Sequence, residues 1–372
     1  MKLLDLTNFY GKQSGGVRTY LDQKIEYIEK RADIEHTLII PGERDEVVYR
    51  KRTKILKLSG WKVPFYPSYR LVLNIPKIKE TIKKEAPDIV ELSDPYTMAL
   101  ALFMARIDKP IIGVYHADLP AYFSRYLSGF GLSRIGESIG WKYVKWIFGQ
   151  CSLVLAPSNQ VIEMLKAHKV NKNIKEIFYG VDNKTFSPEK KDEGFRERYK
   201  IKEDSVILLY VGRLAKEKHL HILTSAFMRL GRKYHLCVVG DGPYRKEMEI
   251  VLKSKGVTFF GYTRDLETLA RIYASADIFV TPSPTETFGI TVLEALASGL
   301  PVIGVDRGGV KDVITQDVGV LAQPDNPEDL AEKIALLASL KGAMGKKMIE
   351  KARAYTWEAA FSSIFEHYEE CM

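Results

Sequence analysis

Short apolar runs alternate with helical stretches along nearly the whole chain. Five runs in the first half are too short for helices and read as buried strands, at residues 3–6, 36–40, 88–92, 110–115 and 152–156. Strands that alternate with helices form a parallel sheet with helices on both of its faces. The sequence therefore predicts an α/β fold, in which ligands bind beyond the carboxyl ends of the strands.

The length of the chain predicts two domains, because 372 residues exceed the usual size of one hydrophobic core. A polar, charged stretch at 183–199 is the best candidate for the boundary. After it, the alternation of strands and helices begins afresh at 206–211. We expect a first domain at 1–187 and a second at 188–355.

The net charge of +8 comes from the first half of the chain. Residues 1–187 contain 29 Lys and Arg against 20 Asp and Glu, whereas the remainder contains 26 against 27. A basic domain suits an acidic acceptor or an anionic membrane surface, and general solubility is the alternative. We expect no nucleic-acid partner, because no DNA- or RNA-binding motif occurs.

Three features favour a cytoplasmic protein. The longest apolar runs are shorter than ten residues, well below the length of a membrane span. The N-terminal residues form a first strand rather than a signal peptide, since an acidic residue stands at position 5. The three cysteines, Cys151, Cys237 and Cys371, are far apart and lack the spacing of metal ligands.

Residues 281–309, TPSPTETFGITVLEALASGLPVIGVDRGG, combine two carboxylates with the start of a helix. Glu286 lies in the predicted loop, and Glu294 lies in the predicted helix. Backbone N–H groups at the helix start would form an anion site, namely those of Phe288, Gly289 and Ile290. Carboxylates beside an anion site suit a ligand that brings hydroxyls as well as phosphate, and a nucleotide sugar brings both.

This stretch closely resembles the donor-site signature of the retaining glycosyltransferases of family 4, which have the GT-B fold. The resemblance lies in two glutamates separated by seven residues within PSPTETFGITVLEALASGLPVI, and it extends over nearly the whole chain. It implies two Rossmann-like domains facing a cleft, with the nucleotide sugar mainly on the second. It also implies that Glu286 contacts the donor sugar and Glu294 the ribose. The alternative is a loop glutamate and a solvated helix glutamate.

The last segment of the chain, at 356–372, has an apolar face formed by Trp357, Phe361, Ile364, Phe365 and Tyr368. Family members return such a terminal helix to the first domain. By this resemblance we expect the C-terminal helix to cross back and to pack on the N-terminal domain.

Further residues of the second domain extend the expected donor site. Arg213 and Lys218 follow the first strand of that domain and resemble the family's clamp on the donor diphosphate. A surface ion pair with Glu217 is the alternative. The backbone at Gly240 gives close access to the donor. The resemblance places Tyr262 beside the nucleotide base, and core packing explains this aromatic residue equally well.

In the first domain, Gly15 and Gly16 stand between a strand and a helix, where the family carries a loop against the donor phosphate and the acceptor. Arg18 follows in the first helical turn and is assigned to the acceptor side, with a surface arginine as the alternative. His116 follows a buried strand, and YHADLP resembles the family's strand-end histidine beside the donor sugar. There it would hydrogen-bond a sugar hydroxyl or position the acceptor. Asp118 is expected on the acceptor side.

We expect no metal and no cofactor beyond the nucleoside-diphosphate sugar, which is a co-substrate. His116 and Asp118 form no complete metal site, since the neighbouring sequence holds no second His or Cys. The Asp-x-Asp motif of metal-dependent sugar transferases does not occur in the sequence.

Residues 50–71 mix basic and aromatic side chains around two prolines, Pro64 and Pro67. Proline breaks the stretch too often for a long amphipathic helix, so it reads as a surface loop. Such a loop would meet lipid headgroups or an acidic acceptor through Arg50, Lys51, Arg52, Lys54, Lys57 and Lys62, together with Trp61 and Phe65. A surface excursion with a few packed aromatic residues is the alternative.

Together these features predict a metal-independent, retaining glycosyltransferase that moves a hexosyl group to a hydroxyl of a glycan or lipid. The YHADLP setting favours mannose from GDP-mannose, and a UDP-linked glucose or related sugar is the alternative. Two other classes compete with this function. One is a GT-B epimerase of nucleotide sugars, and the other is a protein that binds nucleotide sugars without catalysis.

Overall fold

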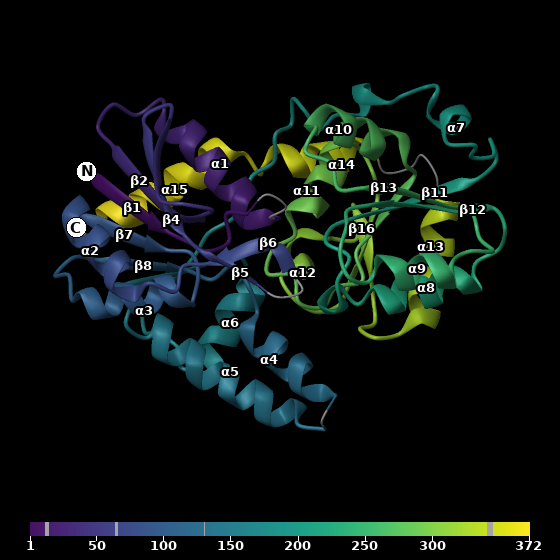
Figure 1. Cartoon of the computed structure of the whole chain (residues 1–372). Coiled ribbons are helices and arrows are strands. Elements are labelled where there is room, and N and C mark those ends of the chain that lie inside the picture. The colour runs from purple at the N-terminus through teal and green to yellow at the C-terminus, as the bar shows by residue number, and fades with distance from the viewer. Residues whose placement is uncertain (12–14, 64–65, 130, 341–344) are drawn as a thin grey trace. The chain divides into compact units, whose positions relative to one another are not determined.

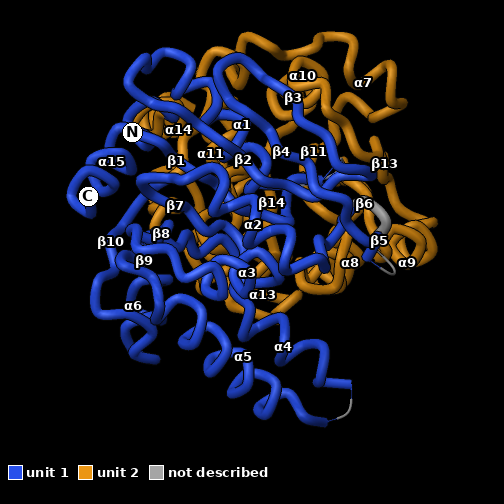
Figure 2. The backbone as a smooth tube through the Cα atoms, turned by 60° about the vertical axis from the view of Figure 1, so that its left-hand side comes forward, with its two compact units in different colours: residues 1–178, 357–372 blue, residues 179–356 orange. Residues whose placement is uncertain are grey.

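The computed structural model describes residues 1–11, 15–63, 66–129, 131–340 and 345–372. It divides the chain into a first unit of residues 1–178 and 357–372 and a second unit of residues 179–356 (Figures 1 and 2). Each unit has its own sheet, its own hydrophobic core and helices along the sheet. The prediction of an α/β fold with parallel sheets is confirmed.

The sheet of the first unit has the order β10-β9-β8-β7-β1-β2-β4-β3. Its strands pair in parallel, except that β3 runs antiparallel to β4 at one edge. All five predicted strands are present in it. The strands are β1 Lys2–Leu6, β2 Glu35–Gly42, β3 Glu46–Arg50, β4 Thr53–Ser59, β7 Ile89–Leu92, β8 Ile111–Val114, β9 Leu153–Ala156 and β10 Ile174–Glu176.

The prediction of a loop at 50–71 is wrong for most of that stretch. β4 pairs with β2 inside the main sheet, and β5 (Trp61–Val63) pairs with β6 (Tyr66–Leu71) as a separate antiparallel ribbon. The sequence TKILKLS contains three apolar residues, Ile55, Leu56 and Leu58, which are buried, while Lys54 and Lys57 stay partly exposed. Adjacent buried residues such as Ile55 and Leu56 point to opposite faces of a strand, so β4 is covered on both faces, and the prolines lie after it in sequence. Pro64 and Phe65 lie outside the described residues.

The helices of the first unit include the C-terminal one, α15, which packs against α1. The ring of Phe361 on α15 contacts the rings of Tyr20 and Tyr27 on α1. Ser158 accepts a hydrogen bond from the backbone N–H of Val161 and so caps α6. The helices are α1 Gly16–Ile28, α2 Ile75–Glu85, α3 Thr97–Ala105, α4 Leu119–Ser128, α5 Ser133–Phe148, α6 Asn159–Ala167 and α15 Trp357–Glu369.

The second unit contains a six-stranded parallel sheet with the order β13-β12-β11-β14-β15-β16. The run VILLYV of β11 is almost wholly apolar, as expected for a strand covered on both faces. The strands are β11 Val206–Val211, β12 Tyr234–Val239, β13 Val257–Gly261, β14 Ile278–Val280, β15 Val302–Val305 and β16 Gly319–Ala322.

Helices cover this second sheet, and the longest of them are α8 (Leu220–Arg229), α10 (Leu266–Ser275) and α13 (Pro327–Ser339) (Figure 1). The other helical segments are η1 Pro188–Lys190, α7 Phe195–Arg198, η2 Lys216–Lys218, α9 Arg245–Val251, α11 Ile290–Ala297, α12 Val310–Val313 and α14 Gly345–Arg353. Over the described residues of both units, no helix is long and apolar enough to cross a membrane.

Candidate functional site

The strand order of the second unit brings two loops of distant sequence together. β11 and β14 are neighbours in the sheet, but the chain runs outward from β11 to β12 and β13, and from β14 in the opposite direction to β15 and β16. Ligands of open α/β sheets bind outside the carboxyl ends of the strands at such a reversal. Lys218 follows β11 and Glu286 follows β14, so both of these predicted site residues lie at the reversal.

Lys218 and Glu286 form an ion pair there. The Lys218 Nζ lies 2.5 Å from the Glu286 Oε1, and the two side chains are only 19% and 22% exposed. The two loops also meet through Thr285, whose hydroxyl donates to the backbone carbonyl of Glu217 over 3.3 Å. A cation for phosphate and a carboxylate for sugar hydroxyls therefore lie side by side on a partly buried surface.

The backbone around Glu286 is held by the turn that follows β15. The N–H of Gly309 donates to the carbonyl of Glu286 over 2.7 Å. Gly308 has a φ of +79°, and a Cβ added to it would lie 2.8 Å from that same carbonyl oxygen. Glycine is therefore required at position 308 for both its conformation and its space.

Arg213 is engaged within its own loop. Its guanidinium forms an ion pair with Glu217 four residues later, and its backbone carbonyl accepts a hydrogen bond of 3.1 Å from the Tyr210 hydroxyl. The alternative of an ion pair with Glu217 is therefore present in the structure. The pair holds Arg213 against Glu217, the residue before Lys218, and a role for both cations at a diphosphate stays a prediction.

Gly240 follows β12 and lies against the loop that carries Arg213. Its φ is +129°, and a Cβ added to it would lie 1.9 Å from the carbonyl oxygen of Gly212. No other residue type would allow the loops after β11 and β12 to approach so closely. Tyr262 lies just beyond the end of β13 at the same edge and is 38% exposed. Its contact with a nucleotide base stays a prediction.

The helix α11 begins at the predicted place. Gly289 caps it in the left-handed region with a φ of +96°, and Ile290 is its first residue. The ring of Phe288 is buried between Tyr179 and Tyr355 within the same unit. The side chain of Phe288 thus fixes the start of the helix. The predicted contact with an anion would therefore be made by the backbone N–H groups.

Glu294 lies on α11, partly buried, and is bound by a tyrosine that the sequence analysis did not single out. The Tyr273 hydroxyl donates to the Glu294 Oε2 over 2.8 Å. Burial raises the pKa of Glu294 to about 7, although the bond from Tyr273 acts against this shift. Glu294 therefore titrates near neutral pH and is not a solvated helix glutamate.

The first unit has a reversal of the same kind between β1 and β7. Asn8 follows β1, and its backbone N–H and side-chain amide both donate to the Asp94 carboxylate, which follows β7. Burial raises the pKa of Asp94 to about 6. Asn8 and Asp94 each stand two residues after the end of a strand, β1 and β7 respectively. That position after a strand is the sequence signal by which Asn8 can be found.

Gly15 and Gly16 lie at the start of α1, where Gly15 is the capping residue, and residues 12–14 before them are outside the described part. Arg18 is partly buried and holds the loop after β1. Its Nη1 donates to the Gly11 carbonyl over 2.8 Å, and its guanidinium stacks over the Tyr10 ring at 4.9 Å. An acceptor contact for Arg18 stays a prediction, because these contacts show only a structural role.

His116 follows β8 and its ring is oriented by a chain of hydrogen bonds. The Ser93 hydroxyl donates to the Glu91 Oε1 over 3.0 Å, so the Ser93 oxygen accepts from the His116 Nε2 at 3.2 Å. Burial lowers the pKa of His116 to about 3. The ring is therefore neutral at physiological pH, with its proton on Nε2 and an acceptor lone pair on Nδ1.

Asp118, two residues after His116, caps α4. Its carboxylate accepts a hydrogen bond of 3.2 Å from the backbone N–H of Ala121. Capping explains why this residue type stands there, and a contact with an acceptor stays a prediction.

The Glu91 that orients Ser93 belongs to a buried charge cluster, which the sequence analysis missed. Lys24 on α1 donates to Asp5 on β1 and to Glu91 on β7, each over 2.9 Å. The Tyr368 hydroxyl, on α15, donates to Glu91 as well. Burial opposes the charge on Lys24, but the two carboxylates outweigh it and raise the pKa of Lys24. The cluster ties α1 and α15 to the sheet.

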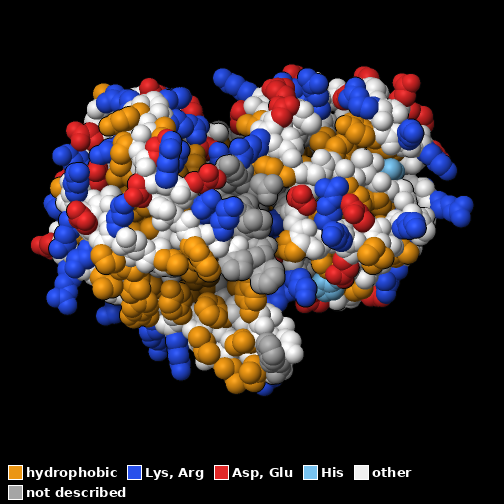
Figure 3. Space-filling view, in the orientation of Figure 1, with side chains coloured by type: hydrophobic (Ala, Val, Ile, Leu, Met, Phe, Trp, Pro, Cys, Tyr) orange, Lys and Arg blue, Asp and Glu red, His pale blue; other side chains and the backbone are white. Residues whose placement is uncertain are grey.

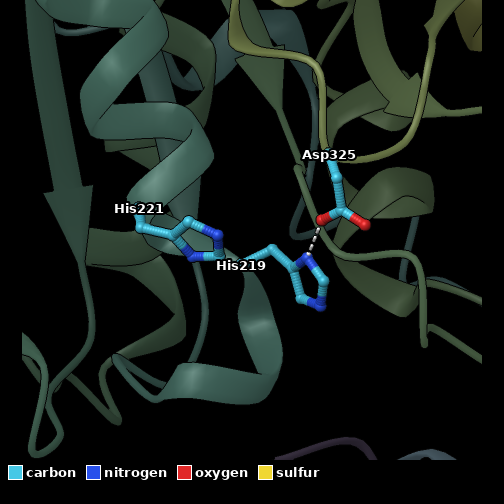
Figure 4. A group of neighbouring side chains, drawn as sticks. All are labelled: His219, His221 and Asp325. Atoms are coloured by element: carbon cyan, nitrogen blue, oxygen red, sulfur yellow. Dashed lines mark hydrogen bonds and ion pairs between the residues drawn. The ribbon is translucent and has the colours of Figure 1, made fainter.

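Three side chains of the second unit have the chemistry of metal ligands. The ligand atoms of His219, His221 and Asp325 all lie within 4.8 Å of one another (Figure 4). Two imidazoles and a carboxylate suit zinc or another transition metal. The His219 Nδ1 and the Asp325 Oδ1 are hydrogen-bonded to each other at 2.6 Å, so a metal would have to replace that bond. The absence of a metal requirement stays a prediction.

Two family models match this chain. Residues 191–355 match "Glycosyl transferases group 1", and residues 14–184 match "Glycosyltransferase Family 4". The "Sucrose-phosphate synthase" structure from Thermosynechococcus elongatus is similar with a TM-score of 0.83. The match covers 100% of this chain and 98% of that one at 21% identity, so it supports the fold.

Relatives of known activity include a "GDP-mannose-dependent alpha-mannosyltransferase" of Corynebacterium glutamicum. It is 31% identical, over 89% of this chain and 80% of that protein. A "GDP-mannose-dependent alpha-(1-6)-phosphatidylinositol dimannoside mannosyltransferase" of Mycobacterium tuberculosis is 26% identical over 98% of this chain and 95% of that one. "Sulfoquinovosyl transferase SQD2" of Arabidopsis thaliana is 30% identical over 84% of this chain, which spans 62% of that protein.

The fold and these matches define a glycosyltransferase with two α/β domains. The chain belongs to glycosyltransferase family 4, of the GT-B fold, and uses a nucleotide sugar as its donor.

Proposed function

We propose that this enzyme transfers a hexosyl group from a nucleoside-diphosphate sugar to an acceptor hydroxyl of a glycan or lipid, with retention at the anomeric carbon. The observation that carries the proposal is the approach of Lys218 to Glu286 at the reversal of the second sheet. It juxtaposes the two chemistries that a nucleotide sugar needs, a cation for phosphate oxygens and a carboxylate for sugar hydroxyls.

In the proposed reaction, the bond from the anomeric carbon to the diphosphate oxygen breaks and negative charge grows on the leaving group. Arg213, Lys218 and the N–H groups around Gly289 stabilise that charge. Glu286 accepts hydrogen bonds from the sugar hydroxyls, and Glu294 accepts those of the ribose. The acceptor oxygen bonds to the anomeric carbon on the same face, and its proton passes to the departing phosphate. No separate general base is assigned.

The first unit contributes to this proposal through one neutral imidazole. The Ser93 hydroxyl orients the His116 ring, and a neutral ring can accept as well as donate a hydrogen bond, which suits contact with a sugar or acceptor hydroxyl. A charged His116 would instead donate from both nitrogens. Because its pKa is lowered to about 3, we assign it no acid–base step near neutral pH.

We propose GDP-mannose as the donor, and the two GDP-mannose-dependent relatives support this choice. The sulfoquinovosyl relative is named for a different sugar, so a second class of donor is also considered. A UDP-linked glucose or related sugar is therefore the alternative donor.

The first experiment is a thermal-shift screen of nucleoside-diphosphate sugars, because a ligand of the folded state raises the melting temperature. GDP-mannose should give the largest shift. Transfer is then measured with the best donor and a set of glycan and lipid acceptors, and NMR of the product should show the anomeric configuration of the donor. A product of opposite configuration would contradict retention. New free nucleotide sugars after incubation with donor alone would indicate an epimerase instead.

A further inference from the structure

Helix α5 of the first unit has two apolar faces, and only one of them is used by the fold. The buried face carries Gly136, Gly140, Val144, Ile147 and Phe148. A Cβ added to Gly136 would lie 2.5 Å from the Phe123 carbonyl oxygen, and one added to Gly140 would lie 2.6 Å from the Pro120 Cα. The close packing of α4 on α5 is thus complete on that face.

The second face of α5 is an exposed stripe. Ile135, Ile139 and Trp146 are 53%, 46% and 48% exposed, at the spacing of residues that share one side of a helix. Leu132, just before the helix, extends the stripe by one turn and is 42% exposed. An isolated exposed apolar residue is ordinary, but a row of four large ones is not.

Helix α3 continues this surface. Its sequence TMALALFMA is apolar all round, so the core takes one side while Leu100 and Met104 remain 38% and 50% exposed on the other. The ring of Phe103 on α3 lies 6.5 Å from that of Trp146 on α5, which joins the two exposed sides. Figure 3 shows the result as a broad apolar area over α3 and along the α4–α5 hairpin.

Basic side chains border the same area. Residues 97–150 contain six Lys and Arg against three Asp and Glu. Lys142 lies within the exposed stripe of α5 and Lys145 lies beside Trp146, and both are exposed. In the described part of the chain neither of these lysines pairs with a carboxylate. Arg106 and Arg134 are exposed as well, at the end of α3 and the start of α5.

The basic stretch proposed from sequence offers less uncompensated charge. Arg50, Lys51, Lys54 and Lys57 form ion pairs with Asp22, Glu26, Glu85 and Glu46. The positive charge of these four residues is therefore largely neutralised by carboxylates of the first unit. A membrane contact therefore fits the α3–α5 face better than the strands β4 and β5.

We propose that the α3–α5 face docks onto an anionic lipid bilayer and lies in its interface. Large apolar residues with a tryptophan, bordered by uncompensated lysines and arginines, form the composition that binds this interface. The positive charge is complementary to anionic headgroups. A second copy of the chain would bring the same positive charge to the contact and is disfavoured for that reason.

The location of this face relates it to the acceptor. The α4–α5 hairpin starts at Asp118, two residues after His116, so one continuous segment joins the docking face to the candidate site residue of the first unit. Leu119, at the start of α4, lines the same small pocket as His116. Docking would hold this sheet edge close to the bilayer surface. A headgroup hydroxyl is therefore the acceptor class that this arrangement favours, and that part rests on the proposed function.

The test is co-sedimentation of the full chain with vesicles of phosphatidylcholine alone and with vesicles that also contain phosphatidylglycerol. The wild-type chain should bind only the anionic vesicles strongly. Ile139→Glu with Trp146→Glu, and separately Lys142→Glu with Lys145→Glu, should each weaken that binding by about tenfold or more. All four positions are exposed, and circular dichroism should show unchanged folding.

Two matched controls define the surface. Ile250→Glu changes a residue of α9 that is 76% exposed, and it should leave vesicle binding unchanged. Lys51→Glu with Lys62→Glu reverses the charge in the other basic stretch and should change binding less than twofold. The proposal is overturned if the wild-type chain ignores anionic lipid, or if the α5 variants bind as it does. It is also overturned if the Lys51 and Lys62 pair proves the sensitive one.

Two further measurements distinguish membrane docking from self-association of the chain and from the proposed transferase function. Sedimentation equilibrium should show a monomer, and a dimer that the Ile139 and Trp146 variant dissociates would identify a second copy as the occupant and overturn membrane docking. Calorimetry with nucleoside diphosphate should give equal affinity for wild type and α5 variants. Vesicle binding without any sugar transfer would contradict the proposed function and leave the docking face standing.

Discussion

The Lys218 Nζ lies 2.5 Å from the Glu286 Oε1, although the two are 68 positions apart in the chain. The strand order places them there, since β11 and β14 are neighbours in the sheet. In the pair, each of two partly buried charges is neutralised by the other. A bound donor would have to share or replace this contact, which makes the pair the natural point to test the site.

Replacement of Glu286 by Ala should abolish sugar transfer while nucleotide binding largely survives. The carboxylate is assigned to the sugar hydroxyls, and loss of one preorganised group at a transition state typically lowers kcat by about 100- to 1,000-fold. Steady-state transfer assays and calorimetry with nucleoside diphosphate measure the two effects. Glu217→Ala, which removes the partner of Arg213 but no assigned sugar contact, is the comparison. A Glu286→Ala enzyme with near-normal transfer would end this assignment.

Replacement of Arg213 or Lys218 by Ala should weaken binding of nucleoside diphosphate far more than that of nucleoside. Each cation is assigned to phosphate oxygens, and charge-assisted hydrogen bonds of this kind are the stronger ones. We expect a loss of about tenfold or more in diphosphate affinity for each variant. Lys216→Ala, at the start of the same short helix, is the control. Equal losses for diphosphate and nucleoside would show that the variants disturb the loop and not a phosphate contact.

Glu294 should make both binding and stability depend on pH near neutrality. Its pKa is raised to about 7 by burial, so the folded state binds its proton more tightly than the unfolded chain does. The stability from this protonated form is fully present below the ordinary value of 4.5 and is lost as pH rises through about 7. Glu294→Gln should therefore melt at a higher temperature than wild type near pH 8 and at a similar one near pH 4.

The same variant tests the assignment of Glu294 to the ribose. The deprotonated carboxylate accepts from two hydroxyls, so the affinity of wild type for nucleoside diphosphate should rise through about pH 7. The terminal phosphate of the nucleoside diphosphate also titrates in this range. The Glu294→Gln variant shows how much of the pH dependence comes from the phosphate alone. Identical pH profiles for the two proteins would show that Glu294 does not contact the nucleotide.

Replacement of Lys24 by Met should destabilise the first unit strongly. The change leaves Asp5 and Glu91 buried without their cation, and breaking a buried pair in this way costs about 3–5 kcal/mol. Urea unfolding followed by circular dichroism measures the effect. Lys30→Met is a matched control, because Lys30, in the turn after α1, pairs with Glu358 on α15 while both side chains are more than half exposed. That variant should lose less than about 1 kcal/mol.

Much of the fold follows from local patterns. The apolar runs at β1, β2, β7, β8 and β9 and the strand–helix–strand unit around Glu286 are encoded by run length, helical spacing and Gly or Pro stops. The stretch at 50–71 differs from the predicted loop, because the apolar residues Ile55, Leu56 and Leu58 form a buried strand ahead of the prolines.

The buried cluster could not be found in the same way. A lysine at position 24, an aspartate at 5 and a glutamate at 91 look like ordinary charged residues in sequence, because nothing local shows that one interior encloses all three. Tyr368 joins them from the other end of the chain, and Asn8 reaches Asp94 in a similar manner.

The sequence by itself determined the types of chemical group in this enzyme and the strand ends that carry them, since those depend on neighbours within a few residues. Tertiary structure alone decided which groups meet. Lys218 reaches Glu286 because two strands distant in sequence are adjacent in the sheet. It also decided which apolar faces are left exposed. Helical periodicity shows that Ile135, Ile139 and Trp146 share a side of α5, but only the packing of α4 on the opposite face leaves them open to solvent.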